Sequence, residues 1–258
     1  MPYVEVAGDK IYYALHQNSA RGKVPLVLVH GAGENRLVWP AALRRMSGIP
    51  VYAVDLPGHG KSDGQGRRSV EEYATFVAQM LDALAIDQAV IAGHSMGGGI
   101  AQQFGLSYPT RAAALILVAT GARLRVAPKI LESTQSDAQT AAEWITQYEW
   151  GTDTPEQMKR LGRQQLLTNR LDVFHGDYAA CDKFDVMERL GDIRAPTLVI
   201  GGTADQMTPP KYAVYLTEHI PGAQLSLVEG AGHMVMLERE EAVARPVEQF
   251  LRAQGLLS

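Results

Sequence analysis

A serine flanked by glycines, in the Gly-x-Ser-x-Gly pattern centred on Ser95, constrains the fold of this chain more than any other feature. An apolar run rich in β-formers, residues 89–92, comes before it, and a small-residue helical pattern follows it. The local order is therefore strand, sharp turn, helix. A serine in so tight a corner has strained dihedral angles, so its neighbours need almost no side chain, a condition that Gly93 and Gly97 meet. The pattern predicts a hydroxyl at the tip of the turn, with a helix N-terminus directed at whatever it attacks.

The chain on either side of this turn alternates strand and helix patterns. This order indicates a mostly parallel sheet with right-handed crossovers and helices on both faces. Near the N-terminus, residues 2–7 and 10–16 predict an antiparallel hairpin at a sheet edge. Apolar runs predict buried strands at 25–29, 50–54, 89–92 and 113–119, and further strands are predicted at 196–201 and 224–228. The predicted helices are a short one around 39–46, then 70–84, the helix after Ser95, 208–219 and 238–251, with a kink at Pro246 in the last.

Residues 122–190 interrupt the alternation with helical stretches and no strand pattern. We therefore expect a core domain formed by residues 1–121 and 191–258, with a helical cap inserted between its two parts. Such an insertion usually covers the active site, because ligands of α/β sheets lie beyond the carboxyl ends of the strands. The predicted helix N-caps are Ser69 with Glu72 in the core, and Ser136 with Gln139 and Thr154-Pro155 with Gln157 in the insertion.

Two residues that could activate Ser95 follow later strands. Asp205 comes after the strand 196–201, and His233 comes after the strand 224–228. A serine hydroxyl needs a base to take its proton, and the base needs a third group to hold its orientation. The carboxyl ends of parallel strands meet at one sheet edge, so the three side chains are expected to lie together. The chain order Ser, Asp, His predicts nucleophile, acid and base in that order.

These motifs resemble the α/β-hydrolase superfamily over nearly the whole chain, and they are most similar to its branch of small esterases, haloperoxidase-like enzymes and C–C hydrolases. The resemblance implies an eight-stranded sheet and an oxyanion hole formed by the backbone N–H groups of Ala32 and Met96. It also implies that the insertion 122–190 is the cap domain of the family. The segments that carry it are 30–33, 55–62, 93–98, 201–205 and 230–233.

Other polar residues are expected to be structural. His30, His59 and His94 lack metal-ligand spacing, so hydrogen bonding within turns is the better interpretation, and no metal or cofactor is expected. Asp55 is interpreted as a hydrogen-bond anchor at the end of a strand, and Cys181 as a small buried apolar residue. Four aromatic residues of the insertion are candidates for the substrate pocket, with the core of the cap as the alternative: Trp144, Trp150, Phe174 and Phe184.

The predicted reaction is hydrolysis of a carboxylic ester of small to medium size through an acyl-enzyme intermediate. The triad is equally compatible with C–C bond cleavage of β-diketone or meta-cleavage products, with a thioesterase, and with a perhydrolase side activity. A ligand-binding receptor that turns over slowly is the alternative from another class. No basic cluster is apparent near the triad loops, which favours uncharged acyl groups.

Charge and cysteine content limit the environment. The net charge of −4 does not favour a nucleic-acid partner, and no apolar run approaches the ~20 residues of a membrane span. Cys181 is the single cysteine, so an internal disulfide is excluded, and the N-terminus has no signal-peptide pattern. We expect a cytoplasmic enzyme acting on a small-molecule ester and water, and the oligomeric state stays open.

Overall fold

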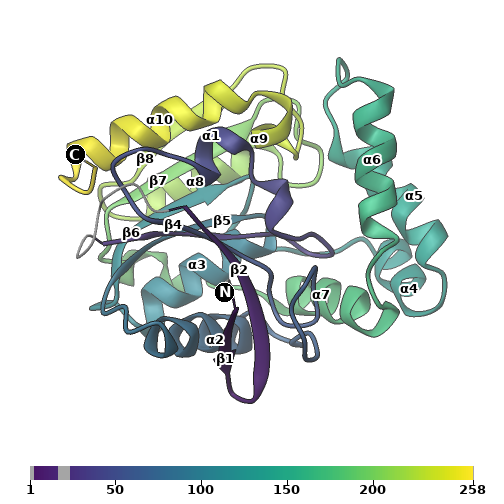
Figure 1. Cartoon of the computed structure of the whole chain (residues 1–258). Coiled ribbons are helices and arrows are strands. Elements are labelled where there is room, and N and C mark those ends of the chain that lie inside the picture. Colours follow the sequence, from purple (N-terminus) through teal and green to yellow (C-terminus); the bar gives the residue numbers. More distant parts are fainter. Residues whose placement is uncertain (1–2, 17–23, 258) are drawn as a thin grey trace.

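The protein is an eight-stranded sheet covered by helices, seen in a computed structural model that describes residues 3–16 and 24–257 (Figure 1). The strand order is β1-β2-β4-β3-β5-β6-β7-β8. Strands β3 to β8 pair in parallel, whereas β1 and β2 form the antiparallel hairpin at one edge. The predicted sheet is confirmed. The strands are β1 Tyr3–Val6, β2 Asp9–His16, β3 Leu26–Val29, β4 Val51–Val54, β5 Ala89–His94, β6 Ala112–Val118, β7 Thr197–Gly202 and β8 Gln224–Val228.

Helices cover both faces of the sheet. Apolar side chains of α2, α3 and α8 pack on one face, and those of α1 and α10 pack on the other. The helices are α1 Ala41–Arg44, α2 Val70–Ala83, α3 Met96–Ser107, α4 Pro128–Ser136, α5 Ala138–Glu149, α6 Glu156–Leu166, α7 Leu171–Lys183, α8 Pro210–His219, α9 Val235–Glu238 and α10 Glu240–Ala253. Two 3₁₀ turns add η1 Arg36–Val38 and η2 Met187–Asp192. No helix of the described residues is long and apolar enough to cross a membrane.

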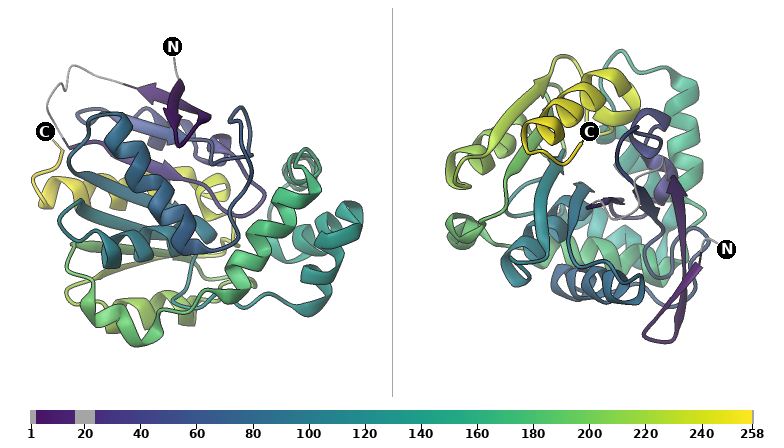
Figure 2. Two further views of the ribbon diagram at one scale, coloured as in Figure 1. Left: turned by 90° about the horizontal axis from the view of Figure 1, so that it is seen from below. Right: turned by 60° about the vertical axis from the view of Figure 1, so that its left-hand side comes forward.

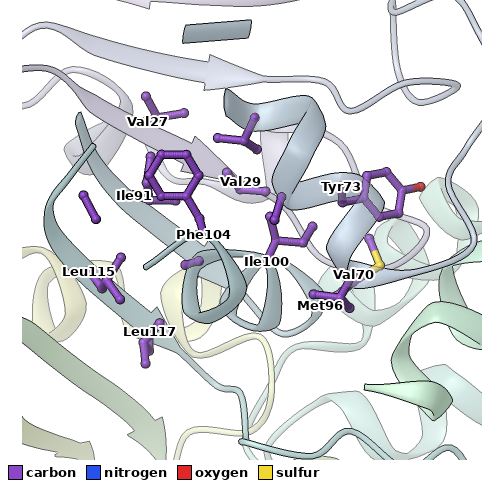
Figure 3. Close-up of a cluster of buried hydrophobic side chains, with 14 of the residues drawn as sticks. Val27, Val29, Val70, Tyr73, Ile91, Met96, Ile100, Phe104, Leu115 and Leu117 are labelled. Atoms are coloured by element: carbon purple, nitrogen blue, oxygen red, sulfur yellow. The ribbon is translucent and has the colours of Figure 1, made fainter. Parts of the chain in front are cut away.

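Helix α3 is central to the core on its face of the sheet. Its residues Ile100 and Phe104 are fully buried and lie among the apolar side chains of neighbouring strands and of α2 (Figure 3). Burial of side chains of this size stabilises the fold by about 1.5–3 kcal/mol each. The helix that begins immediately after Ser95 is thus held tightly against the sheet, and so is the turn that precedes it.

Two predicted helices differ from the observed ones. The predicted helix 39–46 is shorter, because Pro40 has an extended backbone and the α-helix begins only at Ala41. The predicted closing helix 238–251 is two helices, α9 and α10, which are separated at Arg239 with φ −141° and ψ 60°. Pro246 lies inside α10, as expected.

The predicted helix caps are confirmed in the core but wrong in the insertion. Ser69 accepts the N–H of Glu72 at 3.2 Å and caps α2. Ser136 instead ends α4, and the adjacent Asp137 caps α5, since a carboxylate is a stronger acceptor for the N–H groups of a first turn. Thr154 donates its hydroxyl to Glu238, so α6 begins without a side-chain cap.

Helices α4 to α7 lie together beside the sheet (Figures 1 and 2). They have an apolar cluster of their own, in which Ile145 and Phe174 are almost completely buried. Residues 124–183 of the described chain contain no strand, which agrees with the helical pattern of the sequence.

A buried carboxylate on α7 joins this group of helices to the core. Asp177 is fully buried and accepts hydrogen bonds from Gly33 N at 2.9 Å, His59 Nε2 at 2.7 Å and the Tyr73 hydroxyl at 2.5 Å. The other ring nitrogen of His59 faces the carbonyl of Pro57, which is also an acceptor. Burial lowers the pKa of His59, but the charge of Asp177 and the hydrogen bond to it outweigh burial and raise that pKa. Both ring nitrogens can then donate, and the ion pair is fully satisfied.

Removal of this carboxylate is expected to destabilise the protein strongly. Asp177→Ala leaves the buried donors of three segments without an acceptor and should cost about 3–5 kcal/mol of unfolding free energy. Urea unfolding measures the loss. The matched control is Asp172→Ala on the same helix, where an exposed pair with Arg170 is removed and little change is expected. Equal stability of Asp177→Ala and the control would contradict this account.

Candidate active site

Ser95 occupies the sharp turn between β5 and α3 in a strained conformation. Its φ is 51° and its ψ is −114°, outside the regions that L-residues ordinarily adopt, at a cost of about 1–3 kcal/mol. A Cβ at Gly93 would overlap the carbonyl of Gly97, and a Cβ at Gly97 would overlap the carbonyl of Val29. Glycine is therefore required at both positions, as the sequence predicted.

Three donors hold the backbone of this turn. The Ser95 carbonyl accepts hydrogen bonds from Gly98 N at 2.9 Å, Gly99 N at 3.2 Å and Thr120 Oγ1 at 2.7 Å. The N–H of Ser95 donates to the carbonyl of Val118 at 3.0 Å. The side chain of Ser95 is thus the free part of the residue, and it is partly exposed.

Asp205 and His233 form a buried pair although 28 residues separate them in the chain. Asp205 Oδ2 lies 2.9 Å from His233 Nδ1. The carboxylate also accepts from Met207 N and Thr208 N, and from the Thr208 hydroxyl at 2.7 Å. Burial raises the pKa of Asp205, but His233 and these donors outweigh it, so the pKa is lowered and Asp205 is ionised at neutral pH. His233 is thereby held with Nδ1 towards the carboxylate.

The loop that carries His233 is held from two more directions. His94 Nε2 lies 3.0 Å from the carbonyl of His233, and His94 Nδ1 lies 3.0 Å from the carboxylate of Glu34. Both partners accept hydrogen bonds, which suits a doubly protonated ring, and the pKa of His94 is raised by Glu34 against the effect of burial. From the insertion, the Glu149 carbonyl accepts from His233 N at 2.9 Å and from Met234 N at 3.2 Å.

Glu238 ties the same loop to the insertion a second time. Its carboxylate accepts from Gly232 N, next to His233, and from Gly151 N and the Thr154 hydroxyl after α5. One side chain therefore joins the histidine loop to the loop between α5 and α6. The position of His233 depends on the insertion as much as on the sheet.

Ser95 and His233 line one cavity of about 350 Å³ at the carboxyl ends of the strands. Helices α4, α5 and α7 contribute to its wall. No hydrogen bond of ordinary geometry joins Ser95 Oγ to His233 Nε2 among the described residues, and such bonds often tighten only when substrate binds. The apolar part of the lining includes Leu124, Val126, Ile130, Ile145, Met207 and Tyr212.

The four aromatic residues expected at the pocket lie elsewhere, and the expectation is corrected. Trp150, Phe174 and Phe184 are each at most 5% exposed and belong to apolar clusters, and Trp144 packs against one of these clusters. None of the four is among the residues that line the cavity. The smaller side chains of α4 and α5 and three tyrosines form the wall instead. Large aromatic rings gain more from complete burial than from a place at a cavity surface.

Two cations also line the cavity, although no basic cluster is apparent in the sequence. Arg125 donates to the carbonyl of Asp182, and Lys129 lies 3.6 Å from the ring centroid of Trp144. Both side chains are exposed. The sequence analysis favoured an uncharged acyl group because no basic cluster was apparent near the triad loops. The two cations at the cavity wall remove that reason.

Ala32 and Met96 lie at the positions expected of oxyanion donors. Ala32 lines the cavity with Ser95, and its N–H makes no hydrogen bond to a described residue. Met96 is the first residue of α3, so its N–H has no acceptor within the helix. Both backbone groups are thus available to a ligand next to Ser95.

The remaining polar residues have structural partners, as expected. His30 Nδ1 donates to the Gly31 carbonyl, and its Nε2 accepts from Leu56 N, so the ring is neutral. Burial and the nearby charge of His59 lower the pKa of His30 to about 4. Asp55 accepts from the backbone and the guanidinium of Arg36. Cys181 is buried, and no group of three or more His, Cys, Asp or Glu side chains in the described chain could hold a metal ion.

The fold is that of a class of hydrolytic enzymes, and comparisons with known proteins show which family it is. Residues 26–245 match the model of the alpha/beta hydrolase family. The chain is 32% identical to a 2-hydroxy-6-oxononadienedioate/2-hydroxy-6-oxononatrienedioate hydrolase of Burkholderia vietnamiensis, over 97% of this chain and 95% of that one. It is 31% identical to a pimeloyl-[acyl-carrier protein] methyl ester esterase of Yersinia enterocolitica, over 89% and 93%.

Solved structures give the same result. A thermophilic esterase superposes with a TM-score of 0.86 at 35% identity, covering 98% of this chain and 97% of that one. The enol-lactonase of Burkholderia xenovorans superposes with a TM-score of 0.89 at 25% identity, covering 97% and 100%. The chain belongs to the alpha/beta hydrolase family and is an enzyme of that family.

Sequence reasoning did not find Glu34, Glu149, Thr208 and Glu238, which surround the pair of Asp205 and His233. None of them stands in a motif, and only the folded chain brings them to this site. Glu149 is the most unusual of them, because its pKa is raised to about 8. Burial is the main cause, and the charge of Glu34 adds to it, whereas His94 and the indole of Trp150 lower the pKa. The indole N–H nevertheless makes no hydrogen bond of ordinary geometry.

The raised pKa of Glu149 predicts a pH-dependent loss of stability. Below pH 4.5 the carboxyl is protonated in both the folded and the unfolded chain, so it does not change the free energy of unfolding there. Between pH 4.5 and about 8 only the unfolded chain loses the proton, and stability falls by roughly 1.4 kcal/mol per unit of pKa difference. Glu149→Gln does not titrate. Urea unfolding of both proteins should show that the unfolding free energy of the variant increases relative to that of the wild type as pH rises through this window. A constant difference would contradict the prediction.

Proposed function

We propose that the protein hydrolyses carboxylic esters of small to medium size through an acyl-enzyme on Ser95. The observation that carries the proposal is the buried pair of Asp205 and His233 beside Ser95 at one cavity. The related proteins named for ester or lactone chemistry support the substrate class. No restriction on the charge of the acyl group is proposed, because Arg125 and Lys129 line the cavity.

In the proposed mechanism Ser95 Oγ attacks the ester carbonyl while its proton passes to His233 Nε2. Asp205 stabilises the imidazolium that forms. The N–H groups of Ala32 and Met96 hold the oxyanion, each contributing about 3 kcal/mol. The tetrahedral intermediate collapses, the C–O bond to the alcohol breaks, and His233 returns the proton to the leaving oxygen. Water then repeats the sequence on the acyl-enzyme and releases the acid.

We further propose that residues 122–190 act as the cap over this site, with helices α4, α5 and α7 shaping the acyl pocket. Their contribution to the cavity wall supports this role. The hydrogen bonds of His233 N and Met234 N to the Glu149 carbonyl, and those of Gly151 N and the Thr154 hydroxyl to Glu238 on α9, support a further role of the cap in positioning the base. We also infer a cytoplasmic location, because the chain has a single cysteine and so forms no internal disulfide.

A second candidate reaction is cleavage of a C–C bond next to a ketone. The relative from Burkholderia vietnamiensis, named for a 2-hydroxy-6-oxo acid, favours it. Turnover of a vinylogous diketone faster than of any ester in a matched panel would select this reaction.

The proposal predicts covalent labelling of one serine. A fluorophosphonate should modify the wild type and the exposed control Ser136→Ala, but not Ser95→Ala, as read by intact mass. Hydrolysis of 4-nitrophenyl butanoate should fall by about 10⁴-fold or more in Ser95→Ala. Asp205→Asn should cost a similar factor, because the base loses its orientation. Equal labelling of the wild type and Ser95→Ala would overturn the assignment, and a single adduct without steady product release would indicate a receptor.

A further inference from the structure

One carboxyl group in the cavity makes no hydrogen bond of ordinary geometry to a described residue. Glu149, the last residue of α5, lines the cavity with Ser95 and His233, and its side chain is only 4% exposed. Its Oε2 is buried and makes no hydrogen bond to a described residue. The other cavity carboxylate, Glu34, differs completely, because it accepts from Gly31 N at 2.6 Å and pairs with His94.

The position of Glu149 is fixed relative to the reacting groups. Its backbone carbonyl accepts the N–H groups of His233 and Met234. The main chain of Glu149 is therefore anchored directly to the main chain of His233. The residue is almost completely buried at the wall of the cavity that Ser95 and His233 also line, so its carboxyl lies close to the bound substrate.

Burial, and after it the negative charges around Glu149, keep its carboxyl neutral. Glu34 faces it from the loop after β3 and Glu238 from α9, and both oppose its ionisation. Tyr178 on α7 adds no positive charge, and the cation of His94 is held between Glu34 and the carbonyl of His233. Among the described residues, no lysine, arginine or histidine forms an ion pair with Glu149. A neutral carboxyl carries one O–H, and no residue that the structure describes bonds to it at Oε2.

The geometry points to Glu149 as a specificity-determining residue that donates a hydrogen bond from its neutral carboxyl to a second oxygen of the substrate. The substrate class is an ester or lactone with a keto or hydroxyl oxygen a few atoms from the scissile carbonyl. A buried donor without a partner costs free energy, which such an oxygen recovers and a plain alkyl chain does not. The inference rests on the proposed ester hydrolysis and adds the substrate feature that the site selects.

The test is a ratio of specificities. The kcat/KM values of 4-nitrophenyl 4-oxopentanoate and 5-oxohexanoate are each divided by that of the plain ester of equal length. At pH 6.5 the wild type should prefer at least one keto ester by about tenfold, the value of one hydrogen bond. Glu149→Gln, which keeps an N–H donor, should retain most of the preference. Glu149→Met, which is apolar and of similar length, should lose it.

The pH dependence of this ratio separates Glu149 from the base. The protonation of His233 affects both esters alike and cancels in the ratio. In the wild type the preference should therefore fall with a midpoint near pH 8, where Glu149 ionises, whereas in Glu149→Gln it should be independent of pH. Glu143→Gln, the same change at an exposed position of α5, is the control and should behave as the wild type.

Infrared difference spectra give a readout that does not need turnover. A protonated carboxyl band of the resting protein should be present at pH 6.5, disappear near pH 8, and be absent from Glu149→Gln. Absence of this band in the wild type would overturn the inference even if no ester were hydrolysed. A wild type that hydrolyses the plain esters but shows no keto preference would also overturn it while leaving the proposed function intact. A preference for cationic esters instead would show an ionised Glu149 and contradict it.

Discussion

The strained turn at Ser95 is the constraint on which the rest of the structure depends. A positive φ at a residue with a side chain is unfavourable, so the surrounding structure must impose it. Helix α3 does so, because its buried face packs on the sheet and the carbonyl of Ser95 receives three donors. Gly93 and Gly97 allow the strand and the helix to approach closely enough for this packing. The result is a hydroxyl at the cavity that makes no hydrogen bond to a described residue.

His233, the proposed base, is positioned by a different kind of interaction, namely buried polar groups from distant segments of the chain. Glu34 and His94 hold the carbonyl of His233 from the sheet side, while the Glu149 carbonyl accepts the N–H of His233 from residues 122–190. Glu238 on α9 accepts from Gly232 N in the same loop and from Gly151 N and the Thr154 hydroxyl in residues 122–190. Asp177 joins α7 to the core. Such groups are stable in the interior only when every donor and acceptor is satisfied, so they permit few alternative arrangements. Glu149 Oε2 is the exception, and its missing partner is the reason to assign it a role toward substrate.

Much of the fold followed from local patterns. Buried strands such as β3 and β5 are continuous apolar runs, and their alternation with helices leaves few topologies for a parallel sheet. Predictions from the sequence failed at positions where contacts in the folded chain decide between two similar residues or two equally suitable environments. Asp137 replaced Ser136 as a cap because both are good acceptors one residue apart. The pocket aromatics failed for a related reason, since Phe174 is equally suited to a cavity wall and to an apolar cluster.

By itself the sequence determined the α/β alternation, the serine turn, and the positions of Asp205 and His233, the proposed acid and base, after later strands. Each depends on residues adjacent in the chain or on the rule that parallel strands end at one sheet edge. Only the tertiary structure decided which side chains surround His233 and which residues line the cavity. Those contacts join segments more than a hundred residues apart, as between His94 and His233, and no local periodicity records them. The unpaired carboxyl of Glu149 belongs to this second group, because burial and the absence of a partner are properties of the folded chain alone.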